Sequence, residues 1–521
     1  MRLGTLAALL LATARIASSY AVATNDDVSD VQEYLDDANT LFLLMSAMMV
    51  FTMQSGFTML EVGAVREIAM KSILLKNIFD ASLAALLWWA CGYAFAYGSD
   101  PFGKTGSNGF IGTSGFFYSG KGSGEDGSPL TQTVYGKTHG KAVWVFNWAF
   151  AGVAGTIVSG AVAERCKFFA YLMYSFTITG FIYPIVVHLV WSKDGFFSAN
   201  RTNRLCAGCG VIDFAGSGVV HMTGGIASLV GATIVGPREG RFDTIQGPNG
   251  GRYASAFQTL GVLLLWFGWY GFNVGSTGGI VGKGGLGAHV MMTTTIAAST
   301  GCFATTAITY VFEKDNATLV RNANNGILAG LVSITAGCAT SSLWASFVIA
   351  VVASFVYFSA SRLLIYLRID DPVDAFAVHG VCGLWGVIAA ALFAAPFYYS
   401  RAYDDERAHR CASVFYGGNP GGSLQAAVLF CLFLIAWVTA TGLLAFLLIH
   451  LLLPGGARMA LEAHASWETA VDFDERETSE LVRLDQSDTM NTKLTVESDD
   501  DVMRNNVDRF EQRFEPEPDP D

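Results

Sequence analysis

The sequence predicts an all-α membrane protein of eleven transmembrane helices, arranged as two inverted five-helix repeats plus one extra helix. Three observations lead to this fold class. Charged residues make up 15% of the chain, against about 25% in soluble domains, and the mean hydropathy is +0.40. Apolar segments long enough to span a bilayer recur along the chain. The fifth and tenth of these segments share one pattern of polar residues, as expected of an internal repeat.

Each predicted helix is a run of about 20 apolar residues, the length that crosses a hydrocarbon core of ~30 Å. The 57 glycines fit the same class, because small residues let helices approach closely in lipid. The eleven segments are 41–62, 74–97, 142–163, 168–191, 213–236, 254–275, 287–312, 323–339, 343–366, 374–396 and 423–452, of which the eighth is short.

Both ends of the chain lie outside the helical region. Residues 1–23 resemble a signal peptide, with Arg2 at the start, an apolar run and small residues at the predicted cleavage site. The alternative is an uncleaved leader. Cleavage would leave residues 24–40 as an extracellular segment. An odd number of spans then puts the tail, 454–521, in the cytoplasm of a plasma-membrane protein. Lys and Arg are only slightly denser in the predicted inner loops, which supports this orientation weakly.

The tail is acidic and poor in aromatic residues from Glu475 onward, which predicts disorder. We predict a cytoplasmic regulator or a kinase as its partner, and a solvated spacer is the alternative. A phosphate would either repel the tail from acidic groups or dock it on inner-loop cations. The candidate phosphorylation sites are Ser479, Ser487, Thr489 and Ser498, and the candidate docking cations are Arg165, Arg238 and Arg241.

Composition also excludes several classes. No basic stripe exists to meet phosphates, so we expect no nucleic-acid partner. No nucleophile constellation is visible, so we expect neither an enzyme nor a cofactor. In the outer loops either a Cys206–Cys209 or a Cys209–Cys411 disulfide is possible, but these residues are too few for a metal site. The sequon at Asn200 lies outside and predicts a glycoprotein, whereas the one at Asn316 lies inside and should stay unmodified.

The shared pattern of the fifth and tenth segments is an Asp followed by a His eight residues later, Asp213 to His221 and Asp371 to His379. Eight helical residues advance ~12 Å. Because the second repeat is inverted, the two histidines approach the middle of a ~30 Å core from opposite faces. They can then face each other, one donating a proton while the other accepts it.

Simpler interpretations apply to the same residues. A single His in an apolar helix is usually a satisfied core residue. Two histidines at matched depth favour function, since intramembrane ionisable residues are rare and costly. Metal binding by two histidines is disfavoured, because zinc needs more protein ligands. Asp213 and Asp374 stand where helices begin, so both are candidate N-caps. Asp213 would also attract cations at the outer mouth.

With these motifs the sequence resembles the ammonium transporter family, in its Amt/Mep branch. The resemblance runs from about 40 to 455 and identifies 41–453 as an ammonium transporter domain. The segments that carry it are Met53-Gln-Ser-Gly-Phe-Thr-Met-Leu-Glu-Val-Gly63, Asp213-Phe-Ala-Gly-Ser-Gly-Val-Val-His221, Trp269-Tyr-Gly-Phe-Asn-Val-Gly-Ser276 and Asp370-Asp-Pro-Val-Asp-Ala-Phe-Ala-Val-His-Gly380. Residues 455–462 depart from the family's usual continuation, which puts gating between subunits in doubt.

The resemblance implies a homotrimer in the lipid bilayer, with one narrow pore in each subunit. It makes His221 and His379 the twin pore histidines, and Phe150 and Phe272 the pore gate. It assigns the outer ammonium site to Trp191, Ser276 and Phe150, and Asp213 to the family's characteristic aspartate. Aromatic faces attract ammonium by cation–π interaction, and an apolar constriction opposes bare ions but passes ammonia.

Three functional hypotheses follow. The first is a transporter that recruits ammonium, removes its proton and conducts ammonia past the twin histidines. The second is an Rh-like passive gas channel, in which the histidines carry no proton. The third is an ammonium sensor that transports little. Trp191, Ser276 and Phe150 favour the first, because they suit a cation rather than a gas.

Overall fold

The computed structural model describes residues 25–98, 108–119, 140–201, 205–243, 253–313, 318–417 and 422–459. These residues belong to one unit, Met1–Met459, and a second unit comprises Ala460–Asp521. The predicted signal peptide, the inner sequon at Asn316 and the tail beyond Met459 lie outside the described residues.

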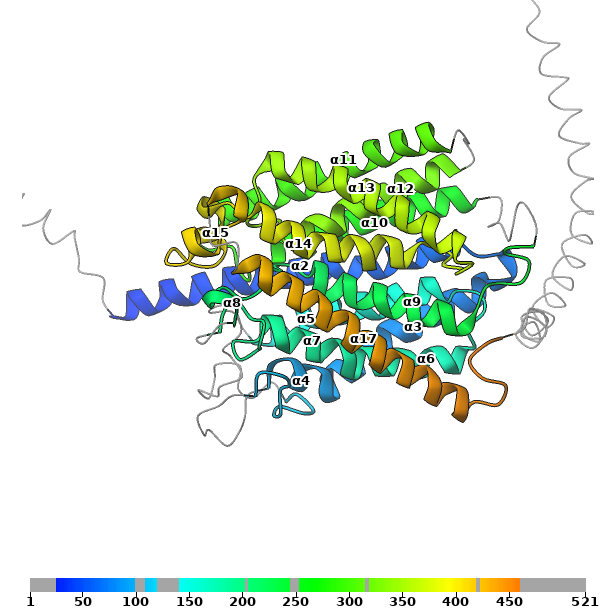
Figure 1. Ribbon diagram of the computed structural model, residues 1–521. Coiled ribbons are helices and arrows are strands. Elements are labelled where there is room, and N and C mark those ends of the chain that lie inside the picture. Colours follow the sequence, from blue (N-terminus) through cyan, green and yellow to red (C-terminus); the bar gives the residue numbers. More distant parts are fainter. Residues whose placement is uncertain are drawn as a thin grey trace, which may run out of the picture. The chain divides into compact units, whose positions relative to one another are not determined.

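The described chain is a bundle of long helices that run side by side (Figure 1). Seven long α-helices are unbroken: α2 (Asn25–Val62), α5 (Gly140–Ala161), α10 (Ala254–Gly275), α11 (Gly284–Phe312), α12 (Leu319–Thr335), α13 (Leu343–Tyr366) and α17 (Ser423–Leu452). Within the described ranges there is no β-strand, only isolated bridges such as that between Cys166 and Arg458.

Four further helical segments each contain a π-helical turn. They are η1 (Glu67–Ala69), α3 (Met70–Leu87), η2 (Trp88–Gly92) and α4 (Tyr93–Tyr97); α6 (Phe168–Thr177), η4 (Ile178–Ile182) and α7 (Tyr183–Trp191); η5 (Ser217–Met222) and α9 (Thr223–Val235); and η7 (Phe376–Val381) and α14 (Cys382–Phe393). Short helices follow in the connections: α8 (Leu205–Gly208), α15 (Pro396–Ala402), α16 (Ala408–Cys411) and η8 (Val414–Tyr416).

Nine helical segments of the described chain are long and apolar enough to cross a membrane. This confirms an all-helical, multi-pass membrane protein. The remaining two predicted spans correspond to α10 and α12, which are helical but fall outside the nine. α12 has 17 residues and carries Asn322, Asn324 and Asn325 on its buried side. The count of eleven spans therefore stays a prediction.

The first helix begins earlier than predicted. Residues 24–40 were predicted to precede the first span, and from Asn25 onward they belong to α2, which runs unbroken to Val62. No Gly or Pro occurs between Asn25 and Ser55, so nothing in the sequence ends the helix. The hydropathy pattern predicted only 41–62, which is the apolar part of the longer helix α2.

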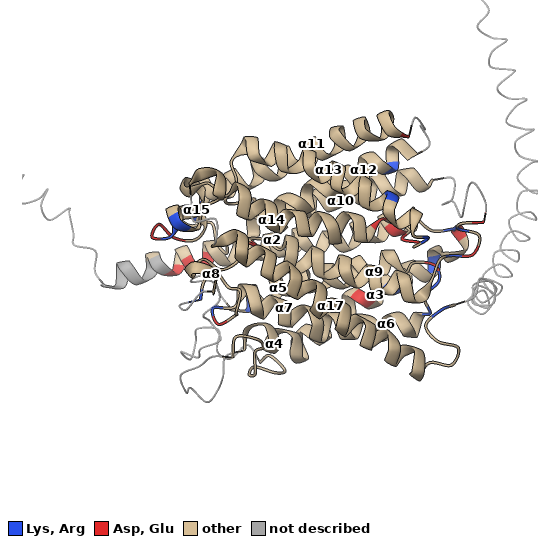
Figure 2. Cartoon of the chain, in the orientation of Figure 1, with Lys and Arg blue, Asp and Glu red and all other residues tan. Residues whose placement is uncertain are grey.

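Charged residues gather at the two ends of the bundle, and the stretch between the ends is largely free of them (Figure 2). We call the end that contains α8 and α15 the Asp213 end. The opposite end, where α9 leads into the loop that contains Arg238, is the Arg238 end. At the Asp213 end a disulfide joins Cys209 to Cys411, which decides between the two predicted pairings and leaves Cys206 free.

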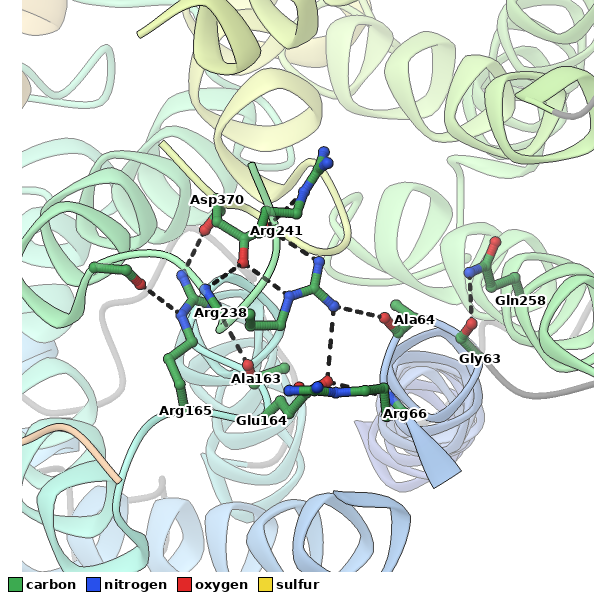
Figure 3. A network of polar contacts seen from close by, with 11 residues as sticks. Gly63, Ala64, Arg66, Ala163, Glu164, Arg165, Arg238, Arg241, Gln258 and Asp370 are labelled. Atoms are coloured by element: carbon green, nitrogen blue, oxygen red, sulfur yellow. Dashed lines mark hydrogen bonds and ion pairs between the residues drawn. The ribbon is translucent and has the colours of Figure 1, made fainter. Parts of the chain in front are cut away.

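At the Arg238 end, ionic and hydrogen bonds connect four loops (Figure 3). Arg238 binds both carboxylate oxygens of Asp370, at 2.8 and 3.0 Å, and donates to the Ala64 carbonyl at 3.1 Å. Arg165 donates to the backbone carbonyl of Asp370, and Glu164 pairs with Arg66. Burial alone would raise the pKa of Asp370, but Arg238 and Arg165 lower it to about 2.

This network bears on the predicted docking of a phosphorylated tail. Arg165 is 3% exposed and Arg238 is 6% exposed, and both already hold protein acceptors. Of the three proposed docking cations, only Arg241 has a partly exposed side chain, at 26%.

The first six residues of the predicted tail are held against the bundle. Lys167 donates its backbone N–H to the Ala457 carbonyl, and Met459 donates to the Arg165 carbonyl, each at 2.9 Å. Arg458 also donates to the Val235 carbonyl at 3.0 Å. The described chain therefore continues as structure to Met459, six residues beyond the predicted boundary at Leu453.

Candidate functional site

Two histidines meet inside the bundle, as their spacing predicted. Nδ1 of His379 lies 3.2 Å from Nδ1 of His221, and the ring planes differ by 21°. His221 is 0% exposed and His379 is 3% exposed. A hydrogen bond at this contact requires one Nδ1 to carry a hydrogen and the other to accept it.

The local backbone explains how the two histidines reach each other. Both lie in π-helical turns, η5 and η7, and such turns occur frequently at functional sites. The two segments touch at Gly225, where a Cβ atom would come within 2.0 Å of the Gly380 nitrogen. Only glycine allows this approach. The sequence pattern gave the glycines but contained no signal for the π turns.

Two phenylalanines are stacked on the Asp213 side of the histidines. The rings of Phe150 and Phe272 are 3.8 Å apart between centroids and 13° from parallel, and both side chains are buried. Phe272 also lies 5.4 Å from the His221 ring. The stacked pair therefore lies directly beside the histidine pair.

Trp191 lies on the far side of the stacked pair, next to Phe150. Its ring is 5.9 Å from Phe150 in an edge-on arrangement, and its Nε1–H donates to the Asp213 carbonyl at 2.9 Å. The Ser276 hydroxyl donates to the Phe272 carbonyl at 2.8 Å, which leaves its oxygen lone pairs to accept another hydrogen.

A cavity of about 80 Å³ opens at this point and is bordered by Trp191, Asp213 and Ser276. Two cations that the sequence interpretation missed, Lys283 and Arg401, border it too. Lys283 donates to the Thr277 carbonyl at 2.6 Å, and burial lowers the pKa of its ammonium group. A larger apolar groove of about 630 Å³, between α3, α6 and α17, contains none of these residues.

Asp213 caps the helix that carries His221. Its carboxylate accepts from the backbone N–H groups of Gly216, Gly218 and Val219, at 3.1, 3.0 and 2.8 Å. The residue precedes the span Ser217–Val235. Burial raises the pKa of Asp213 to about 6, although the N–H groups act in the opposite direction.

The predicted N-cap at Asp374 is wrong. Its carboxylate instead accepts from Asn325, Tyr357 and Ser361. Asp371 takes the capping position and accepts from Phe376 N–H at 2.8 Å. The reason is the backbone at Asp374, whose φ of +58° turns the chain one residue before Ala375.

The seven predicted residues thus lie along one route. Ring contacts connect Trp191, Phe150, Phe272, His221 and His379 in that order, and Asp213 and Ser276 border the cavity at its start. One further residue joins them: Trp269 stacks on His221 at 4.8 Å and donates to Thr335. The only sign of Trp269 in the sequence was its place at the start of the motif Trp269–Ser276.

Comparison with known proteins agrees with this arrangement. The model of the Ammonium Transporter Family matches residues 41–464. Ammonium transporter 1 member 1 of Oryza sativa subsp. japonica is 41% identical over 404 residues, 74% of each chain. Ammonium transporter 1 member 1 of Arabidopsis thaliana is 41% identical over 411 residues, 75% of this chain and 76% of the relative.

Two solved structures share the fold. A sensor Amt protein has 29% identity and a TM-score of 0.69, covering 83% of this chain and 98% of its own. Mep2 of Saccharomyces cerevisiae has 25% identity and a TM-score of 0.70, covering 82% of this chain and 88% of its own.

Proposed function

We propose that this chain, which belongs to the ammonium transporter family, recruits ammonium at the Asp213 end, removes its proton and conducts ammonia past the histidine pair. The observation that carries the proposal is the continuous row of rings from Trp191 to His379. Each part of this row suits one step of the transport.

Recruitment needs an aromatic face, a hydrogen-bond acceptor and negative charge. Trp191 supplies the first and Ser276 the second, with Phe150 behind them. Cation–π attraction reaches about 2 kcal/mol once the cation loses water. Asp213 supplies the negative charge through its field, since its carboxylate oxygens already bind backbone N–H groups. Lys283 and Arg401 act against it, so the net attraction is modest.

Selectivity arises at the two phenylalanines. Their rings stack at 3.8 Å and leave no polar partner for an ion. An apolar constriction of this kind strongly opposes a charged species. Ammonia is neutral and needs only a brief separation of the rings. Potassium has no proton to lose, so a mechanism that removes a proton excludes it.

Beyond the barrier, the histidine pair accepts hydrogen bonds from ammonia and transfers the proton. Proton transfer along His221 and His379 makes transport electrogenic. A pair that carries no proton makes the protein a passive gas channel. The direct 3.2 Å contact between the two nitrogens favours transfer.

The wider architecture belongs to the same proposal. It comprises eleven spans in two inverted repeats plus one helix, a homotrimer, and a plasma membrane with the Asp213 end outside. Two observations support the repeat: each histidine lies in a π turn, and Asp213 and Asp371 each accept from a backbone N–H five residues ahead.

Current recording on purified protein in liposomes under an ammonium gradient tests the proposal. We expect an ammonium-dependent current in the wild type, and its loss or a changed selectivity in folded His221→Ala/His379→Ala protein. Ammonia flux without current would identify a gas channel, and neither flux nor current would favour a sensor. Wild-type rate and selectivity in the double variant would exclude the proton relay.

A further inference from the structure

A second group of polar side chains is buried between α2, α3 and α5, and the transport route does not use it. Glu61 on α2 is 1% exposed, Asn77 and Asp80 on α3 are 4% and 1% exposed, and Ser159 on α5 is 1% exposed. Ionisable residues inside a membrane bundle are costly and usually functional. The question is what stabilises Glu61 at this position.

The hydrogen bonds around Glu61 are incomplete in a specific way. Asn77 Nδ2 and Ser159 Oγ each donate to Oε2 of Glu61 at 2.9 Å. Oε1 of Glu61 and Oδ1 of Asn77 are both buried, and neither has a partner among the described residues. Both atoms are acceptors, and they belong to two groups that are already joined through Oε2 and Nδ2, so one hydrogen shared between Oε1 and Oδ1 would satisfy both.

A proton on Oε1 supplies that hydrogen. The carboxyl O–H then donates to Oδ1 of Asn77, while Nδ2 of Asn77 donates back to Oε2. This is the cyclic pairing of a carboxylic acid with an amide, in which both groups are satisfied. Oε2 keeps its two donors, as a carbonyl oxygen with two lone pairs can.

The neighbouring charges agree with this assignment. The hydroxyls of Ser175 and Thr156 lie within hydrogen-bond distance of the two Asp80 oxygens and can donate to an ionised carboxylate, although the single Thr156 hydrogen also has Gln54 and Gly152 as acceptors. Lys76 is 2% exposed and donates to the Cys166 carbonyl. With Glu61 neutral, one anion and one cation remain in the group, and no net charge is buried.

The Glu61 site is connected to the histidine end of the route through residues on either side of it. Phe57, one helical turn before Glu61, is 6.0 Å from the His379 ring. A Cβ atom at Gly160 would lie 3.6 Å from Cγ of Glu61 and 2.5 Å from Cγ2 of Val373. Val373 lies in the loop that leads into η7, the turn that carries His379.

We propose that Glu61 is protonated at neutral pH and forms with Asn77 an intramembrane proton-binding site, which releases its proton toward the Arg238 end and regains one from the histidine pair during ammonium transport. The first part stands on the hydrogen bonds alone. The second part, the release and return of the proton, rests on the proposed function. It makes Glu61 a binding site for the transported proton on the Arg238 side of the histidine pair.

Infrared absorption of the purified protein tests the first part. A protonated carboxyl group has a carbonyl stretch separate from that of a carboxylate, and it shifts in D₂O. We expect one such band in the wild type, retained in Asp80→Asn and lost in Glu61→Gln. Glutamine keeps the shape and a donor for Asn77, so this variant should fold normally by thermal unfolding. If no band disappears in Glu61→Gln, Glu61 is ionised and the site is refuted.

Current recording in liposomes tests the second part. Glutamine cannot release a proton, so Glu61→Gln should reduce the ammonium current at least tenfold. Glu67→Gln is the matched control, because it removes an acid from an exposed position six residues away and should retain the current. A Glu61→Gln current within twofold of the wild type would refute proton release. Absence of current in the wild type would count against the proposed function, while the infrared result still decides the Glu61 site.

Discussion

The contact between Gly225 and Gly380 offers a way to separate the histidines without changing either of them. A Cβ atom at Gly225 would lie 2.0 Å from the Gly380 nitrogen and 2.3 Å from its Cα, where ordinary contact begins at 3.4 Å. Gly225→Ala must therefore move the two segments apart by at least 1.4 Å. His379 is the residue before Gly380, so the displacement acts directly on the 3.2 Å contact with His221.

A displacement of this size takes the two nitrogens beyond hydrogen-bond range. Misplacement of reacting groups by about 1 Å costs on the order of 100-fold in rate, and we expect a loss of that order in ammonium flux. Overpacking costs about 1–3 kcal/mol of stability, so the protein should still fold. The measurement is flux into liposomes together with thermal unfolding.

Gly442→Ala is the matched control. Gly442 lies inside helix α17, and a Cβ there meets Val230 at an ordinary 3.5 Å. This variant should transport normally and be slightly more stable, because alanine favours helices. If folded Gly225→Ala protein transports as fast as Gly442→Ala protein, then direct contact between the histidines is not required, and the reasoning fails.

Four other predictions concern the cavity and the tail. Trp191→Leu should weaken recruitment at low ammonium more than it slows flux at saturation; an unchanged concentration dependence would show that another residue supplies the aromatic face. Because the pKa of Asp213 is raised to about 6, the residue loses its negative charge as the outer pH falls through that value, so apparent ammonium affinity should fall there and Asp213→Asn should be insensitive to pH. Lys283→Gln removes a cation from the cavity and should raise ammonium affinity about fivefold, equivalent to ~1 kcal/mol of screened Coulomb repulsion; equal affinity would mean that this lysine is neutral. Truncation after Glu475 should leave assembly intact and change flux only if the tail regulates it; lost assembly would make the tail structural.

The fold could be predicted largely from hydropathy, because a bilayer fixes both the length and the composition of a spanning helix. The predicted segment 168–191, for example, begins and ends where α6 and α7 do. Helix ends that extend beyond the apolar segment give no hydropathy signal. For this reason the prediction missed the first sixteen residues of α2. The anchoring of Pro454–Met459 was missed for the same reason, since it depends on backbone hydrogen bonds that any residue can make.

The histidine pair could be predicted because each histidine follows an aspartate by eight residues, and this shared spacing suggested a shared depth in the bundle. The capping aspartate before η7 could not be predicted, since Asp371 and Asp374 both precede the helix and only the backbone at Asp374 separates their roles. Lys283 and Arg401 were missed because they belong to different connections, the turn before α11 and the short helix α15, 118 positions apart. No local pattern reveals that both border one cavity.

These two cations affect how the cavity can select its substrate. A cavity of about 80 Å³ that contains Asp213, Lys283 and Arg401 has no strong net negative charge. Such a site cannot concentrate cations in general, so the proposed recruitment of ammonium would depend on directed contacts with Trp191 and the Ser276 hydroxyl. Ammonium can donate a hydrogen bond to that hydroxyl and sodium or potassium cannot. Lys283 and Arg401 cancel the Coulomb attraction of Asp213, which would act on every cation alike. They therefore lower the affinity for ammonium but increase its selectivity over sodium and potassium.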